Sequence, residues 1–229
     1  NEKTAKVRDL FGKVAKKYDL MNDVMSLGLH RLWKDELVAQ IPKTGHLLDV
    51  AGGTGDVALR YLRAGGNRAT VLDITPAMLQ RGRQNADSLA VFAAIDFVKG
   101  SAEKLPFPDG SFDAITIAFG LRNITNKETA LREARRVLKT GGKFLCLEFA
   151  KINLQALDKI YQTYNFKILP LLGKYIADQE SSYRYLAESI QLFDDQATLA
   201  KKIELGGFEK VGYQNLMAGV VAIHRGYAL

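Results

Sequence analysis

The chain has 229 residues, of which 47% are hydrophobic and 25% are charged, with a formal net charge of +7. This length and composition suit one globular α/β domain with an added cap, and they exclude a membrane-spanning helix because no apolar run approaches roughly 20 residues. A single cysteine, Cys146, excludes an internal disulfide, and three scattered histidines leave a zinc or iron site unexpected. We expect Cys146 to be a buried strand residue.

Helices and strands are predicted to alternate along the chain up to residue 150. Helical spacing predicts helices over 4–18 and 26–40, and the turn residues of segment 42–45 end the second. The elements that follow are strand 46–50, helix 56–64, strand 69–73, a helix from 75, strand 95–98, strand 112–118, helix 126–138 and strand 143–149. This alternation predicts a parallel sheet with helices on both faces.

Beyond residue 150 the alternation stops. Apolar residues at helical spacing over 151–193 predict a helical insertion, and strands at 210–216 and 220–224 are close enough to form a hairpin. The predicted fold is therefore α/β, a Rossmann-like seven-stranded sheet resembling that of class I methyltransferases dependent on S-adenosylmethionine (SAM). We expect one domain over 1–229, with these parts: an N-terminal helical cap over 1–42, a cofactor-binding core over 43–150, the insertion or lid over 151–193 and the C-terminal hairpin over 194–229.

Segment 47–56 is the strongest indication of a ligand. An apolar run ends at Asp49, and the chain then turns through a loop where a ligand can approach the backbone without meeting a Cβ. The loop consists of Gly52, Gly53, Thr54 and Gly55. A second apolar run ends at Asp73, 18 residues after the loop, where a carboxylate can accept hydrogen bonds from both ribose hydroxyls. This layout predicts an adenosine-containing cofactor.

The loop alone does not decide which cofactor binds. Segment 53–58 also fits the dinucleotide fingerprint, so SAM and the dinucleotides NAD and FAD all remain open on that basis. Asp49 favours SAM, because a carboxylate at the end of the first strand suits its positive amino group and would repel a pyrophosphate. The alternatives are that Asp49 is a turn or capping residue and that Asp73 merely ends a strand.

Positive charge is concentrated near the start of the chain. The basic residues there are Lys3, Lys6, Arg8, Lys13, Lys16 and Lys17. They fit either a solvated helix face or contact with an anionic membrane surface. Nucleic-acid binding is not expected, because aromatic residues do not interleave with these charges. Because the chain opens at Asn1 and not at a methionine, we expect part of the natural N-terminus to be missing.

Several stretches together closely resemble the ubiquinone/menaquinone biosynthesis C-methyltransferases (the UbiE family), over essentially the whole chain. The most specific are FGKVAKKYDLMND at 11–23, SLGLHRLWK at 26–34, TIAFGLRN at 116–123, SYRYLAESI at 182–190 and AGVVAIHRG at 218–226. Segments 100–113 and 135–142 resemble the adenine-side loop and a turn of the wider superfamily. The chain departs from common patterns at Thr75–Pro76 and at Thr140, and neither change touches Asp73.

The resemblance implies a set of cofactor contacts. Gly52, Gly53, Thr54 and Gly55 are expected to cradle the methionine end of SAM, and Asp73 to hold its ribose. Ser101 and Ala102 are expected to border the adenine, and Ala118 to lie against the cofactor.

The family's acceptor is a polyprenylated benzoquinol or naphthoquinol, methylated on a ring carbon. Carbon is a weak nucleophile unless a neighbouring hydroxyl ionises, and a free phenol has a pKa of about 10. Arg122, with a water, is the expected activating group, because a guanidinium lowers a phenol's pKa. Asn123 and Tyr18 are expected to orient the acceptor. The alternatives are a structural ion pair for Arg122, a helix cap for Asn123 and a core position for Tyr18.

A substrate dissolved in a bilayer implies peripheral attachment, at the inner face of a bacterial membrane or on the matrix side in a mitochondrion. A homodimer and membership of a quinone-biosynthesis complex are further expectations. Three alternatives stay open: a sterol-type or other small-molecule C-methyltransferase, a non-catalytic SAM-binding subunit, and a nicotinamide-dependent oxidoreductase. The ending at 222–227 favours the benzoquinol branch without deciding it.

Overall fold

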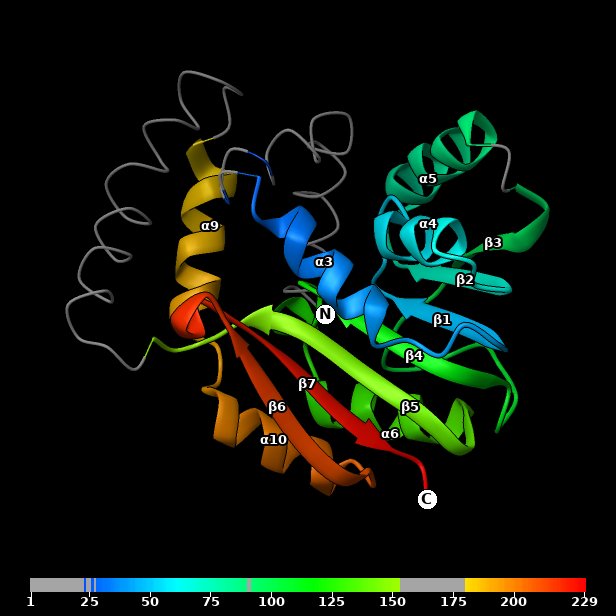
Figure 1. Cartoon of the computed structure of the whole chain (residues 1–229). Coiled ribbons are helices and arrows are strands. Elements are labelled where there is room, and N and C mark those ends of the chain that lie inside the picture. The colour runs from blue at the N-terminus through cyan, green and yellow to red at the C-terminus, as the bar shows by residue number, and fades with distance from the viewer. Residues whose placement is uncertain (1–22, 24–25, 27, 90–91, 153–179) are drawn as a thin grey trace.

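The computed structural model describes residues 23, 26, 28–89, 92–152 and 180–229. The predicted helix over 4–18 and most of the predicted insertion lie outside these residues. One seven-stranded sheet runs through the described part, in the order β3-β2-β1-β4-β5-β7-β6 (Figure 1). The strands are β1 (His46–Val50), β2 (Arg68–Asp73), β3 (Ile95–Lys99), β4 (Phe112–Ala118), β5 (Leu138–Phe149), β6 (Glu209–Leu216) and β7 (Val221–Tyr227).

The first five strands are parallel, and the last two complete an antiparallel edge. β1 pairs in parallel with both β2 and β4, whereas β7 is antiparallel to both β5 and β6. After β1 the chain builds the sheet in one direction through β2 and β3, then returns to place β4 on the other side of β1. The carboxyl ends of β1 and β4 therefore flank the crevice where open α/β sheets bind ligands. The predicted class of fold is confirmed.

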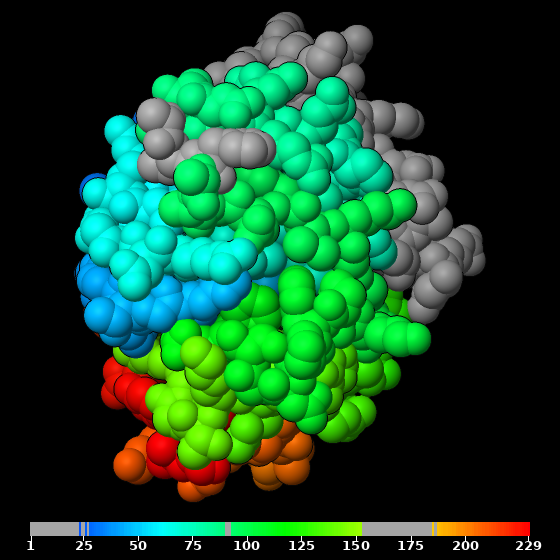
Figure 2. Space-filling view, turned by 90° about the vertical axis from the view of Figure 1, so that its right-hand side faces the viewer, coloured from blue at the N-terminus to red at the C-terminus, as the bar shows by residue number. Residues whose placement is uncertain are grey.

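Helices cover both faces of the sheet. They are α3 (His30–Ala39), α4 (Asp56–Arg63), α5 (Pro76–Ser88), α6 (Lys127–Val137), α9 (Glu180–Gln191) and α10 (Gln196–Leu205), with short 3₁₀ turns η2 (Phe92–Ala94), η3 (Leu121–Asn123) and η5 (Met217–Gly219). Helices α3, α4 and α5 pack on one face, and α6 and α10 pack on the other. Seen from the β3 edge (Figure 2), the C-terminal hairpin lies at the bottom, in orange and red.

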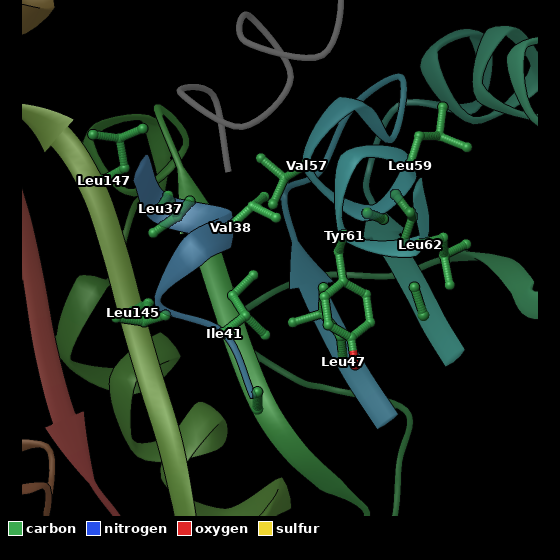
Figure 3. Close-up of a cluster of buried hydrophobic side chains, with 14 of the residues drawn as sticks. Leu37, Val38, Ile41, Leu47, Val57, Leu59, Tyr61, Leu62, Leu145 and Leu147 are labelled. Carbon is green, nitrogen blue, oxygen red and sulfur yellow. The ribbon is translucent and has the colours of Figure 1, made fainter. Parts of the chain in front are cut away.

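The two apolar cores follow from the alternation of side chains along each strand. Leu47 packs under α4 in one core, and its neighbour Leu48 packs in the core on the opposite face. In Figure 3, Tyr61 of α4 lies over Leu47, while Leu145 of β5 lies near the end of α3. Cys146 is fully buried in β5, as predicted. Each such leucine stabilises the fold by about 1.5–3 kcal/mol through burial.

Several boundaries differ from the predictions by a few residues, and one helix was not predicted. Helix α3 begins at His30 and not at 26, because Gly28 adopts a left-handed φ of 78° just before it. β5 begins at Leu138, because Leu138 pairs with Phe112 of β4 and the backbone at Gly141 and Gly142 pairs with Ala228. Helix α10 was not predicted at all; the Asp195 side chain caps it by accepting a hydrogen bond from the Thr198 N–H.

Among the described residues, no helix has both the length and the apolar character needed to cross a membrane.

Candidate cofactor and acceptor site

A cavity opens at the carboxyl ends of β1, β2 and β4. Its open volume is about 740 Å³, counting space that is continuous with solvent. The predicted site residues that line it are Gly53, Asp73, Ser101, Ala102 and Asn123. These residues come from four separate parts of the chain, so the fold brings the predicted cofactor and acceptor residues to one space.

The glycine loop between β1 and α4 folds tightly over the strand ends. Gly55 caps α4 in a left-handed conformation, with φ of 77°, which favours glycine. At Gly52 a Cβ would lie 2.6 Å from Oδ2 of Asp49 and 2.9 Å from Cγ1 of Val71, so only glycine fits. Thr54 is buried within the loop. The loop backbone is thus held against the sheet, and Gly53 lines the cavity.

Asp73 ties the end of β2 to the glycine loop. Its Oδ2 accepts a hydrogen bond from the Gly53 N–H at 2.9 Å, and its Oδ1 accepts one from the Thr75 N–H at 2.8 Å. Burial raises the pKa of this carboxyl, and the backbone donors oppose that rise. A carboxylate oxygen has a second lone pair, so both oxygens can still accept hydrogen bonds from a ligand in the cavity.

Asp49 is a buried carboxyl with an unused oxygen. It is 1% exposed, and its Oδ1 accepts a hydrogen bond from the Thr116 hydroxyl at 2.7 Å. Within the described part of the chain, its Oδ2 has no hydrogen-bond partner. Burial raises the pKa of Asp49 to about 7, against the hydrogen bond from Thr116. Asp49 lies behind Gly52 and not on the cavity wall, so it fits a positive ligand group reached directly or through a bridging water.

Of the remaining predicted cofactor residues, two line the cavity and one does not. Ser101 and Ala102 lie on the wall, in a turn where Ser101 Oγ accepts a hydrogen bond from the Glu103 N–H at 3.2 Å. Ala118, the last residue of β4, is half-buried and does not line the cavity. The next residue, Phe119, lines it instead, with a left-handed φ of 55°.

Arg122 is held in a buried ion pair. Its Nη1 lies 2.7 Å from Oε1 of Glu148 and donates to the Phe119 carbonyl oxygen at 2.6 Å. Oε2 of Glu148 accepts a hydrogen bond from the Arg122 N–H, and the guanidinium lies 5.3 Å from the centre of the Phe149 ring. Arg122 does not line the cavity. This geometry fits the structural ion pair that was the alternative, and the catalytic role stays a prediction.

Asn123, the next residue, does face the cavity. Its Oδ1 accepts a hydrogen bond from the Tyr185 hydroxyl of α9 at 3.0 Å. Tyr18, the other predicted orienting residue, lies outside the described residues. No role was predicted from the sequence for Glu148, Phe119 or Tyr185. A signal existed for Glu148, a lone acid after the apolar run of β5, and for Tyr185, which stands in one of the stretches that resemble the family.

This is the fold of the class I SAM-dependent methyltransferases. A SAM-dependent methyltransferase from Thermotoga maritima, described as a possible histamine N-methyltransferase, superposes with a TM-score of 0.69 at 19% identity, covering 97% of this chain and 99% of that one. A SAM-dependent methyltransferase from Aquifex aeolicus gives a TM-score of 0.62 at 15% identity, covering 86% and 89%. At such identities the likeness shows the fold alone; the [4+2]-cyclase SpnF also matches, with a TM-score of 0.63 at 18% identity, covering 96% and 94%.

The chain belongs to the ubiE/COQ5 methyltransferase family, whose family model matches residues 1–228. The ubiquinone/menaquinone biosynthesis C-methyltransferase UbiE of Acidiphilium cryptum is 50% identical over 230 residues, covering 100% of this chain and 92% of the relative. The protein of the same name from Pseudoalteromonas translucida is 49% identical over 231 residues, covering 99% and 92%. The chain is therefore a methyltransferase, as predicted.

Proposed function

We propose that the chain transfers a methyl group from SAM to a ring carbon of a polyprenylated benzoquinol of the 2-polyprenyl-6-methoxy-1,4-benzoquinol type, and also to demethylmenaquinol. The relatives carry both pathways in their names, which supports both acceptors. The observation that carries the proposal is that Asp73 and Asn123 line one cavity. The acid proposed to bind the cofactor and the polar group proposed to orient the acceptor therefore face the same space.

The residues of the loop and strand ends fit SAM. When bound, SAM supplies a methyl group on a sulfonium leaving group. Asp73 would accept hydrogen bonds from the ribose hydroxyls through its free lone pairs. The unpartnered Oδ2 of Asp49 would attract the amino group, and Ser101 and Ala102 would border the adenine. A pyrophosphate beside Asp49 would be repelled, which argues against the nicotinamide-dependent alternative.

The acceptor side suits an aromatic ring. The half-buried ring of Phe119 lines the cavity and packs against Phe149 and Trp33, with ring centroids 5.0 Å and 6.2 Å apart. Such aromatic groups favour stacked or edge-on contacts with another ring. Attack by carbon requires a neighbouring hydroxyl to ionise, and a donor on Asn123 with the positive field of Arg122 would favour that anion. Holding the ring against the methyl group while excluding water is the remaining task of the site.

Peripheral membrane contact is part of the proposal, because the acceptor carries a polyprenyl tail. The basic residues of segment 3–17 are the candidates for contact with anionic lipid. Retention on anionic but not on neutral vesicles would support this contact. A homodimer and a quinone-biosynthesis complex remain predictions.

The direct test is methyl transfer from labelled SAM to two short-tailed acceptors, a reduced benzoquinol lacking the ring methyl group and a reduced demethylmenaquinone. Labelled product with either acceptor is expected, and the ratio of the two rates assigns the preferred pathway. If SAM binds but neither acceptor is methylated, the proposal is refuted and the non-catalytic subunit is favoured. Competition by NAD and not by S-adenosylhomocysteine would favour the oxidoreductase.

A further inference from the structure

Tyr185 lies in the stretch 182–190, which the proposed function leaves without a task. It belongs to α9, which is drawn in yellow in Figure 1 and contacts the 3₁₀ turn η3. Ala187 and Ile190 of the same helix are 2% and 8% exposed, so α9 is anchored by buried side chains. Tyr185 itself is half-buried. The packing of α9 therefore sets the position of Tyr185. Among the described residues, the partner of its hydroxyl is Asn123.

The Tyr185 hydroxyl donates to Oδ1 of Asn123 at 3.0 Å. The Asn123 backbone is already fixed, because its N–H donates to the Gly120 carbonyl oxygen at 3.0 Å within η3. The side-chain amide is the part that can still turn, and it carries an acceptor on one side and two donors on the other. Holding Oδ1 therefore decides where the donor group Nδ2 can point.

We propose that Tyr185 is a positioning residue for the methyl acceptor: by occupying Oδ1 of Asn123, it turns the Nδ2 donor toward a ring oxygen of the acceptor. This inference rests on the proposed function, in which the acceptor is a hydroxylated aromatic ring. A donor facing that oxygen stabilises the phenolate more than the neutral phenol, whereas a carbonyl oxygen there would do the reverse. Tyr185 thus selects the ionised acceptor, the form whose ring carbon is nucleophilic.

The neighbouring residue, Arg122, lies off the cavity wall. Its Nη1 is held by Glu148 and by the Phe119 carbonyl oxygen, so its charge acts on the cavity from behind the wall. The hydroxyl of Tyr185 stays protonated and able to donate, because burial raises its pKa above the ordinary value while the charge of Arg122 lowers it by less. The adjacent residues Arg122 and Asn123 of η3 are thus held by different elements: Glu148 of β5 pairs with Arg122, and Tyr185 of α9 donates to Asn123.

The test removes the hydroxyl and keeps the ring, with Tyr185→Phe. The matched control is Tyr213→Phe on β6, where the tyrosine is 43% exposed and packs on His224, away from the cavity. A chromophoric nitrophenol, titrated in the presence of S-adenosylhomocysteine, reports by its absorbance how much of the bound phenol is ionised. We expect the ionisation constant of the bound phenol to fall about tenfold in Tyr185→Phe, the size of one hydrogen bond, and not to change in Tyr213→Phe.

Steady-state kinetics give the second readout. Tyr185→Phe should lower kcat/KM for the quinol about tenfold, shift the rising limb of the pH profile to higher pH, and leave the Kd for SAM unchanged. In an Asn123→Ala background the same substitution should have no further effect, because Tyr185 acts through Asn123. An additive loss in the double variant, or equal losses in quinol and SAM binding, would overturn the positioning role and leave a structural one.

The two proposals fail separately. If neither quinol is methylated but the nitrophenol is bound as its anion and depends on Tyr185, the proposed reaction is wrong and the positioning role survives. If quinols are methylated while wild-type protein and Tyr185→Phe ionise the nitrophenol equally, the positioning role is wrong and the reaction stands. If wild-type protein does not stabilise the anion at all, the positioning role is refuted whatever the activity.

Discussion

Glu148→Gln should destabilise the protein more than any surface charge change. The Glu148 and Arg122 side chains are 1% and 5% exposed, so little solvent screens the pair. The carboxylate accepts hydrogen bonds from the Arg122 side chain and from the backbone N–H groups of Arg122 and Phe149. An amide keeps the shape but leaves a buried guanidinium without its counter-charge, which costs about 3–5 kcal/mol. A domain of this size loses roughly 2–4 °C in Tm for each kcal/mol, so we expect a fall of about 6–20 °C.

Urea unfolding at fixed pH measures this loss, with Asp96→Asn as the control. Asp96 pairs with Arg68, and their side chains are 52% and 61% exposed, so the control should lose about 0–1 kcal/mol. Replacing both members of the buried pair, with Arg122→Met and Glu148→Leu together, should cost less than Glu148→Gln alone. Equal small losses in Glu148→Gln and Asp96→Asn would refute the argument that burial makes this pair structurally important.

Three further predictions concern the glycine loop and the acids beside it. Gly52→Ala should weaken SAM binding at least about tenfold in calorimetry, because its methyl group would lie 2.6 Å from Asp49 Oδ2, whereas Gly212→Ala, with no atom nearer than 3.8 Å, should bind normally. Asp73→Ala should weaken binding about a hundredfold, as expected for two lost hydrogen bonds, and unchanged affinity would show that the ribose lies elsewhere. Burial raises the pKa of Asp49 to about 7, so the native state binds more protons than the unfolded chain between about pH 4 and 7, and the free energy of unfolding should fall as pH rises through that range. Asp49→Asn should reduce that slope in urea titrations, and an identical slope would count against the raised pKa.

The cofactor half could be predicted from sequence because its signals are local. Strand β1 runs over the predicted residues, and β2 begins one residue earlier than predicted, since an apolar run ending in an acid or a glycine marks a strand end at a ligand crevice. Helix α10 was missed because few buried positions mark its inner face, although the capping residue Asp195 was a readable signal.

The partners on the acceptor side could not be predicted in the same way. Arg122 and Glu148 are 26 residues apart, and Asn123 and Tyr185 are 62 apart. Their pairing depends on how β5 and α9 pack against η3, and no periodicity in the sequence encodes that. The family resemblance identified the motifs, but only the three-dimensional arrangement shows that Arg122 pairs with Glu148 and that Asn123 pairs with Tyr185.

The strand order also bears on how the chain is assembled during synthesis. In the described sheet β6 has one neighbour, β7, which is made after it and is inserted between β6 and β5. Until β7 emerges from the ribosome, β6 has no sheet to join. The edge of β5 that contains the apolar run 144–147 is then unpaired. An unpaired edge of that composition is prone to pair with other chains. A nascent chain stalled before residue 221 would therefore lack the strand that joins β6 to β5, and the edge of β5 would stay uncovered.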